Sequence, residues 1–516
     1  MSAVRGTLSG RWRRAVAAVS ERTFLVWEGS DGRVASWTYA EFDRLVDEVR
    51  TRFTASGVRP GDTIHLGLAN SPAFVASWLA AANMSACIVP SDPRSSSREF
   101  GLQIERTRPA LAVVGRESAA AYRSGTPSTN SPPIISVDED DIELRELREA
   151  PPTDAERPEA AGCDPAAILF TSGTTSAPKG VVVTQANYAF TGDVMAAAAS
   201  VTTADRLLVV LPLFHANAQY YSFAAAISAG ASVALIHAFS ASGFVAQAAR
   251  HQATHASLFA APMRMVLARG AAPVSGLILR HCWYAQNLTA EQYARITALF
   301  GCRPRQLYGM TETIPAVLTN NALTPQPEAM GTVTLGCDVD IQDEEGRPVP
   351  AGTAGEIVVR GRRGDTLFDG YLDDPVTTAR AFRGGVFRTG DRARRDEQGH
   401  FYFEGRGGDV LKVAGENVSV VEVEAVLAAH QGVLEVAVVG ADDSVRDEVP
   451  VAYVVRAAGH QLLDERALLD WCAARLSPTK RPRAVYFVDE LPRTSVGKIR
   501  KFLLRSPAPA VQEAPR

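Results

Sequence analysis

The sequence predicts an α/β protein: a large N-terminal lobe of stacked α/β sheets, a small β-barrel-like unit and a small α+β C-terminal domain. Apolar, β-branched segments alternate with Ala-rich helical segments over most of the first 400 residues. This alternation is typical of sheets covered by helices. Residues 331–371 contain short β-rich runs around GRPVPAG, and the chain restarts after Gly405 as a compact α/β piece.

In the large lobe, each predicted strand is a short apolar run. The runs are 63–68, 87–90, 112–114, 167–170, 207–211 and 232–236. Between them, 124–164 contains SGTPSTNSPP, an acidic run at 138–141 and PPTDAERPEAAG, so we expect a surface excursion that precedes a strand.

The C-terminal piece is predicted to contain strands at 410–413, 436–439, 452–455 and 484–487 and helices at 421–430 and 464–476. Three glycines surround Arg406, which indicates a boundary at this point. We therefore expect an N-terminal domain at 1–404, a hinge at 405–409, a C-terminal domain at 410–505 and a frayed tail at 506–516.

Composition excludes several classes of protein. The 516 residues carry a formal charge of −4 and are 46% hydrophobic, which excludes a disordered chain, collagen and a polybasic nucleic-acid binder. The apolar stretches at 207–214 and 223–236 are too short or too broken for a membrane span, and no secretory signal opens the chain. We expect a cytoplasmic protein with no nucleic-acid or membrane partner.

Cysteine and histidine spacing gives no sign of a disulfide frame or a metal site. The six cysteines contain no CxxC pair, so we expect reduced thiols. His251 and His255 in HQATH lack the glutamate of HExxH, so an ordinary packed or surface pair is the better interpretation.

The strongest local signal is TSGTTSAPKG, which lies between the apolar runs AAILF and VVVT. Backbone amides and hydroxyls in such a loop can converge on phosphate oxygens, although a loop of this composition is by itself more often a linker. The Pro-Lys-Gly that closes the loop between two strands favours a phosphate cradle, and GxxxxGK[ST] is absent. The candidate residues are Thr171, Ser172, Gly173, Thr174, Thr175 and Lys179.

This loop resembles the signature of the adenylate-forming enzymes, which include acyl- and aryl-CoA ligases, peptide-synthetase adenylation domains and firefly luciferase. The family's other motifs follow in order: PLFHANAQ at 212–219, LYGMTET at 307–313, GEIVVRG at 355–361, RTGD at 388–391, GRGGDVLKVAGENVSVVEVE at 405–424 and PRTSVGK at 492–498. HCWYAQNLTAEQ, GENVS and EVEAVLAAH look most like the crotonobetaine/carnitine-CoA ligase type.

Several of these residues suit a nucleotide on chemical grounds alone. The Asp391 carboxylate has two oxygens that can accept from ribose hydroxyls, and the Tyr308 ring can lie against adenine. The Thr311 hydroxyl can reach the α-phosphate, and Glu312 is a hard oxygen ligand suited to Mg²⁺ on ATP. The resemblance implies the same roles for Asp391 and Glu312 and adds Gln286 to the nucleotide site.

A catalytic role for Lys498 is implied only by the resemblance, because the sequence around it is that of an ordinary exposed lysine. The family's catalytic lysine neutralises charge on the attacking carboxylate and the α-phosphate. The resemblance also implies that Arg406 lies on the ribose side and that Lys412 and Gly415 border a channel for CoA.

The implied mechanism has two half-reactions. The acid first attacks Mg-ATP to give an acyl-adenylate and pyrophosphate. The mobile C-terminal domain then rotates about its hinge, Lys498 leaves, and a pantetheine thiol enters. The hinge position usually held by Asp or Lys is Gly408 here, which permits rotation but fixes neither end state.

The segment that replaces the family's GGAPL loop is YAQNL at 284–288. Bulk at Tyr284 and Leu307 suggests a shortened acid pocket, lined also by Asn217, with His215 at its mouth. Simple packing of these side chains remains an equal alternative.

The leading hypothesis is an ATP-dependent acid–CoA ligase for a small or medium polar acid. One alternative is transfer to a carrier-protein thiol or an amine, including an enzyme that adenylates nitrite to diazotise an arylamine. A non-enzymatic nucleotide binder is disfavoured because Lys498, Glu312 and Asp391 are all present. The acid, the acceptor and the oligomeric state, with a homodimer as one option, are left open.

Overall fold

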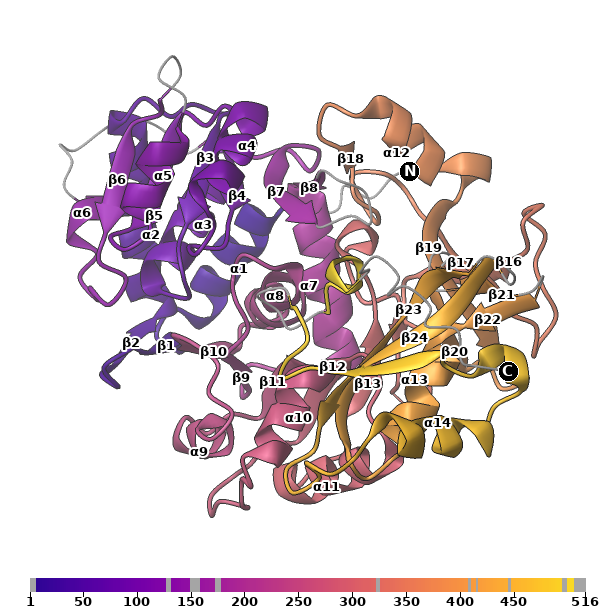
Figure 1. The fold of residues 1–516 in the computed structure, drawn as a ribbon. Helices are drawn as coiled ribbons and strands as arrows, with labels where there is room; N and C mark the ends of the chain where they lie inside the picture. The colour runs from indigo at the N-terminus through magenta and orange to yellow at the C-terminus, as the bar shows by residue number, and fades with distance from the viewer. Residues whose placement is uncertain are drawn as a thin grey trace.

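Four sheets organise the chain, and the α/β fold class is confirmed (Figure 1). The computed structural model describes residues 6–126, 131–148, 158–171, 178–321, 325–406, 410–413, 416–443, 447–493 and 499–504. Among these residues no helix has both the length and the apolar character needed to cross a bilayer.

The largest sheet has nine strands in the order β15-β14-β13-β12-β11-β9-β10-β1-β2. The strands from β13 to β1 run parallel, and β2, β14 and β15 are antiparallel additions at the edges. The bounds are β1 (Thr23–Glu28), β2 (Val34–Thr38), β9 (Arg206–Val209), β10 (Ser232–Ile236), β11 (His255–Phe259), β12 (His281–Ala285), β13 (Arg305–Tyr308), β14 (Leu318–Thr319) and β15 (Thr332–Val333).

The second sheet has seven strands in the order β18-β8-β7-β4-β3-β5-β6. Its bounds are β3 (Thr63–Gly67), β4 (Cys87–Pro90), β5 (Leu111–Gly115), β6 (Ile134–Val137), β7 (Pro165–Thr171), β8 (Lys179–Thr184) and β18 (Gly370–Tyr371). Strand β6 lies inside the segment expected to be a surface excursion. It pairs in parallel with β5 at the sheet edge, so this part of the excursion belongs to the sheet.

Helices lie between these two sheets because their surfaces are apolar on several sides. Every residue of α3 (Pro72–Asn83) is buried, as expected for a helix without a polar face. One buried cluster joins side chains of both sheets to α1 (Leu8–Val19), α2 (Tyr39–Ala55), α3, α7 (Gln185–Ala199) and α8 (Ala224–Ala229). In Figure 1, α7 and α8 accordingly lie near the centre of the molecule.

The opposite face of the nine-stranded sheet has its own core. Residues of β9 to β12 pack there with α9 (Phe244–Arg250), α10 (Ala260–Ala268) and α11 (Ala290–Phe300). The remaining helices of the large lobe are α4 (Ser97–Thr107), α5 (Ala119–Gly125), α6 (Arg145–Arg148) and α12 (Pro375–Ala381). Strands β9 to β12 are therefore buried on both faces, which explains their nearly continuous apolar runs.

The middle of the β-rich unit predicted at 331–371 belongs to a four-stranded antiparallel sheet of order β16-β17-β19-β20 that continues to Arg406, whereas its two ends, β15 and β18, belong to the two large sheets. Its strands are β16 (Asp338–Gln342), β17 (Gly355–Arg360), β19 (Phe387–Arg395) and β20 (Phe401–Arg406).

The chain after β20 forms a five-stranded sheet with two helices. Its elements are β21 (Val410–Val413), β22 (Glu416–Ser419), α13 (Val420–Ala428), β23 (Val433–Asp443), β24 (Asp447–Arg456), α14 (Glu465–Ala473) and β25 (Ala484–Phe487). Glu435 of β23 pairs with Arg493 within this C-terminal lobe and lies 4.0 Å from Arg264 of α10 in the large lobe.

Candidate active site

The two strands that flank the predicted phosphate loop form an antiparallel hairpin. Thr171 ends β7 and pairs directly with Lys179, the first residue of β8. Ser172, Gly173, Thr174 and Thr175 lie outside the described residues. The Lys179 ammonium lies 5.0 Å from the centre of the Tyr371 ring.

Tyr371 connects the phosphate loop to the TET segment of the other large sheet. Its hydroxyl donates a hydrogen bond of 3.0 Å to Oε1 of Glu312, whose side chain is buried. Burial, followed by the negative charge of Glu312, raises the pKa of Tyr371 above its usual range, so the hydroxyl remains a donor at neutral pH. Lys179 and Glu312 are 133 residues apart in the sequence, and one tyrosine contacts both.

The segment after β13 holds Glu312 in a constrained turn. Thr313 Oγ1 accepts from Met310 N at 2.9 Å and donates to the carbonyl of Pro315 or Met310. Ile314 has φ +71°, which is unfavourable for a β-branched residue. Such strain persists only where surrounding contacts fix the backbone, and Ile314 is completely buried.

A second cluster surrounds Asp391. Tyr308 at the end of β13 donates its hydroxyl to Oδ2 of Asp391 at 2.7 Å, and Arg406 Nε lies 2.5 Å from Oδ1. Asp391 and Arg406 are directly paired residues of β19 and β20. Burial, followed by the charge of Asp391, raises the pKa of Tyr308 above its usual range, so this tyrosine stays protonated.

Glu356 fixes the turn that presents Asp391. It accepts hydrogen bonds from the backbone N–H of Gly390 at 3.0 Å and from Arg388 Nε at 2.8 Å. Gly390 has φ +74°, where a side chain would be strained. The motifs GEIVVRG and RTGD therefore lie on neighbouring strands, and Glu356 of the first motif holds the turn of the second. The sequence analysis gave Glu356 no role.

Near the predicted acid pocket, Asn217 and Leu307 are both buried, and Leu307 belongs to the core between the two large sheets. Asn217 begins η1 (Asn217–Phe223), a π-helix. His215 is partly exposed, and the centre of its ring is 4.6 Å from that of Phe214. Thr311 follows β13, with its carbonyl 3.5 Å from the Tyr220 hydroxyl.

The structure places Tyr284 apart from Leu307. Its side chain lies in the second core with Leu258 and Tyr293, and its hydroxyl donates to the carbonyl of Pro327 at 3.2 Å. The strand period of two explains the difference, because Trp283 and Ala285 face the Leu307 side and Tyr284 the opposite side. The residue type alone could not reveal this orientation.

Gln286 follows β12 with φ +74° and an exposed side chain, and its carbonyl accepts from Gln306 at 3.3 Å. Gly408, Gly415 and Lys498 lie outside the described residues. The backbone of Lys412 belongs to β21 and pairs with Asn417.

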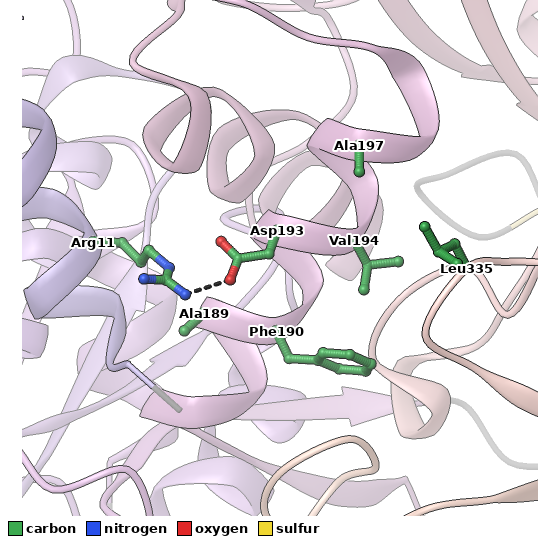
Figure 2. Close-up of a pocket in the computed structure, with 7 residues that line it drawn as sticks. All are labelled: Arg11, Ala189, Phe190, Asp193, Val194, Ala197 and Leu335. Carbon is green, nitrogen blue, oxygen red and sulfur yellow. Dashed lines mark hydrogen bonds and ion pairs between the residues drawn. The ribbon is translucent and has the colours of Figure 1, made fainter. Parts of the chain in front are cut away.

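A surface pocket of about 300 Å³ lies elsewhere (Figure 2). The Arg11–Asp193 ion pair lines it, together with apolar side chains of α7 and Leu335. None of the candidate site residues borders this pocket, so we do not place the substrate there.

Comparison with known proteins shows the family to which the chain is similar. Residues 12–372 match the family described as AMP-binding enzyme, and 422–498 match the AMP-binding enzyme C-terminal domain. The chain is 32% identical over 507 residues to a crotonobetaine/carnitine–CoA ligase of Salmonella paratyphi A, a match that covers 96% of this chain and 98% of the relative. The corresponding protein of Citrobacter koseri is 33% identical over 506 residues, with the same coverage.

Solved structures of CoA ligases are also similar to this chain. A benzoate CoA ligase from Burkholderia xenovorans superposes with a TM-score of 0.86 at 25% identity, over 97% of this chain and 100% of that one. ATP-bound MatB from Rhodopseudomonas palustris superposes with a TM-score of 0.84 at 26% identity, over 96% and 98% of the two chains.

The Asp391 cluster yields a prediction for nucleotide binding. Asp391→Asn replaces one acceptor oxygen by an amide donor, so it should raise the dissociation constant for ATP at least about tenfold, the scale of one hydrogen bond to a charged group. Isothermal titration calorimetry measures this constant. Asp343→Asn is the matched control, because Asp343 pairs with nearby Arg347 in an exposed turn. Equal affinities in the two variants would contradict the assignment.

Proposed function

The chain belongs to the family of AMP-binding enzymes, and from this premise we propose that it converts a small or medium carboxylic acid into its acyl-adenylate with ATP and then transfers the acyl group to CoA. It is an ATP-dependent, AMP-forming ligase. The observation that carries the proposal is the meeting of two clusters next to β13: Tyr308 with Asp391 and Arg406, and Glu312 with Tyr371 and Lys179.

The Asp391 cluster suits the nucleoside end of ATP. A carboxylate oxygen has more than one lone pair, so Asp391 can accept from ribose hydroxyls while it keeps Tyr308 and Arg406. Arg406 also offsets the cost of burying this carboxylate. The Tyr308 ring, held by its hydroxyl, offers a fixed surface to adenine.

The Glu312 cluster suits the phosphate end. Lys179 and the loop from Thr171 to Thr175 would bind the β- and γ-phosphates, and Thr311 the α-phosphate. Glu312 fits a magnesium ion, because Mg²⁺ is usually held by one or two carboxylates together with substrate phosphates. When bound there, the ion would neutralise charge on the phosphates.

In the first half-reaction a carboxylate oxygen attacks the α-phosphorus, and the bond to the bridging oxygen of pyrophosphate breaks. Negative charge grows between the two anions as they approach, so a cation is needed at this point. We assign that role to Lys498. In the second half-reaction the CoA thiol attacks the acyl carbonyl, and AMP and a proton are released.

Contacts of the C-terminal lobe support its part in the first half-reaction. Arg493 and Ile499 form an isolated β-bridge at the two ends of the segment that contains Lys498. Arg493 pairs with Glu435, which lies near Arg264, and Arg264 donates to the carbonyl of Asn287 at 3.2 Å. This chain of contacts ties the base of the Lys498 segment to the loop after β12.

We assign the hinge to Gly408 and the border of the CoA channel to Gly415 and Lys412. Rotation about Gly408 would break the Arg264–Glu435 contact and withdraw Lys498 before CoA enters. A carrier-protein thiol or an amine is the second candidate acceptor, since the acid-activating cluster would serve it equally. We place the reaction in the cytoplasm, where ATP and CoA are available.

Acid-dependent exchange of pyrophosphate into ATP, without CoA, tests the first half-reaction. A panel of short aliphatic, aryl, betaine-like and fatty acids plus nitrite should give exchange with a small or medium carboxylic acid. Lys498→Ala should lower this exchange by roughly 100-fold or more, the scale expected for loss of one transition-state charge contact, with ATP affinity nearly unchanged. Lys480→Ala is the control, because Lys480 pairs with Glu422 on the surface. Exchange with nitrite alone, or unchanged exchange in Lys498→Ala, would overturn the proposal.

Glu435→Gln tests the role of lobe placement. Loss of the charge that holds Arg493 should slow acyl-adenylate formation several-fold in single-turnover experiments, and leave thioester formation from supplied acyl-adenylate unchanged or faster. Glu422→Gln, which removes an exposed carboxylate of α13, should change neither step. Equal slowing of both steps by Glu435→Gln would show that this contact stabilises the lobe without selecting an orientation.

A further inference from the structure

Three buried side chains near Leu307 carry polar atoms that no described residue satisfies. They are both amide atoms of Asn217, Oγ of Ser257 and Nε1 of Trp283. Their residues are only 6%, 4% and 2% exposed, respectively. We call Asn217, Ser257 and Trp283 the polar strip.

Strand register places Ser257 and Trp283 side by side on one face of the nine-stranded sheet. The two residues are paired in the parallel strands β11 and β12, so their side chains point to the same side. Trp283 belongs to the core that contains Leu307, whereas its neighbours Cys282 and Tyr284 belong to the opposite core. The strip therefore faces the interior between the two large sheets.

Asn217 reaches this region from the helix that packs on the same strands. The π-helix η1 contacts β9 and β11, and its residues Ala218 and Tyr221 share the core of Trp283 and Leu307. Its wider turn is seen in the bond from Ala224 N–H to the carbonyl of Gln219, five residues back. Single π-turns of this kind occur frequently at functional sites.

Burial of these groups without partners is costly. A buried donor or acceptor without a partner has lost the hydrogen bonds that it makes to water in the unfolded chain, and most buried polar groups in native proteins are paired. A ligand with hydrogen-bonding groups would recover this free energy, and a pure hydrocarbon would not.

We propose that the polar strip binds a hydroxyl group at the far end of the acid substrate, so that the enzyme selects hydroxy acids over their unsubstituted counterparts. The inference rests on the proposed function for the location of the carboxylate, next to Thr311. Asn217 and Ser257 can both donate and accept, whereas Trp283 only donates. A hydroxyl can donate one hydrogen bond and accept two, so it can bond to one polar atom of each of the three residues.

The register also sets the length of the acid. Trp283 and Ser257 lie two residues before Ala285 and Phe259, the last residues of β12 and β11. Ala285 packs against the core that contains Leu307. Two residues of a parallel strand span about 7 Å. This distance suits the hydroxyl of 4-hydroxybenzoate or of 5-hydroxypentanoate when the carboxylate lies at the strand ends.

A quaternary ammonium group fits this strip poorly. It has no hydrogen-bond donor or acceptor, and would leave the Asn217 amide and the Ser257 hydroxyl unpaired. Burial lowers the pKa of neighbouring His281 well below its usual value, so this side chain is also neutral at pH 7. The inferred substrate therefore differs in chemistry from the betaine compounds for which the Salmonella and Citrobacter relatives are named.

The test compares matched acids by kcat/KM in the pyrophosphate exchange assay. The pairs are 4-hydroxybenzoate with benzoate and 5-hydroxypentanoate with pentanoate, and 4-(trimethylammonio)butanoate is included. The wild type should prefer at least one hydroxy acid over its partner by about tenfold or more, because a site built to bind a hydroxyl rejects the analogue that lacks it. The quaternary compound should be a poor substrate.

Variants assign this preference to the strip. Asn217→Leu should reduce the hydroxyl preference at least about tenfold, and Ser257→Ala and Trp283→Phe should each reduce it several-fold. Thr297→Val is the matched control, because it removes an unpaired buried hydroxyl from α11, next to the opposite core. It should leave the preference unchanged, and thermal melting shows which variants remain folded.

Each outcome has one meaning. The inference would be overturned if the enzyme used both members of every pair equally, or preferred the unsubstituted acids or the quaternary compound. It would also be overturned if the hydroxyl preference survived in folded Ser257→Ala and Trp283→Phe. Each of these results would leave the ligase proposal intact. Exchange with nitrite alone, or with no acid in the panel, would instead contradict the proposed function.

Discussion

The buried carboxylate of Asp391 is the constraint on which the rest of the site depends. A buried charge is stable only when it is paired and hydrogen-bonded, and Asp391 obtains its partners from two other strands, Tyr308 of β13 and Arg406 of β20. These contacts fix the four-stranded sheet against the end of the nine-stranded sheet. They also hold Arg406, the last residue described before the C-terminal lobe.

A second connection joins the two large sheets through Tyr371. Lys179 begins a strand of the seven-stranded sheet, Glu312 follows a strand of the nine-stranded sheet, and Tyr371 contacts both. The apolar core between the sheets makes this arrangement rigid, because helices such as α3 are buried on every side. Asn217, Ser257 and Trp283 bring unpaired polar atoms into this interior, as do Trp78 of α3 and Thr191 of α7.

Much of the fold could be predicted from the sequence, because short apolar runs bounded by turns mark buried strands. The runs at 87–90 and 232–236 coincide with β4 and β10. Strand β6 was hidden by the Pro- and Ser-rich residues around it, and the π-helix at Asn217 has no sequence signal of its own. Tyr284 shows a different limit of prediction from sequence. Its bulk suggested that it lines the acid pocket, but the face of the sheet on which a strand residue lies depends on the register of the strand. Asp391 and Tyr308 were placed at one nucleotide through family resemblance, since 83 residues separate them. Tyr371 and Glu356 were missed because their roles are to hold other site residues in place.

A crystal structure with AMP and a 4-hydroxyphenyl acid bound as the adenylate would test the central claim most directly. The account predicts ribose hydroxyls on the Asp391 carboxylate, adenine against Tyr308, and the phenol oxygen within hydrogen-bond distance of Asn217 or Ser257. A nucleotide bound away from Asp391 would contradict the site, and an acyl group directed away from the polar strip would contradict the account of substrate choice.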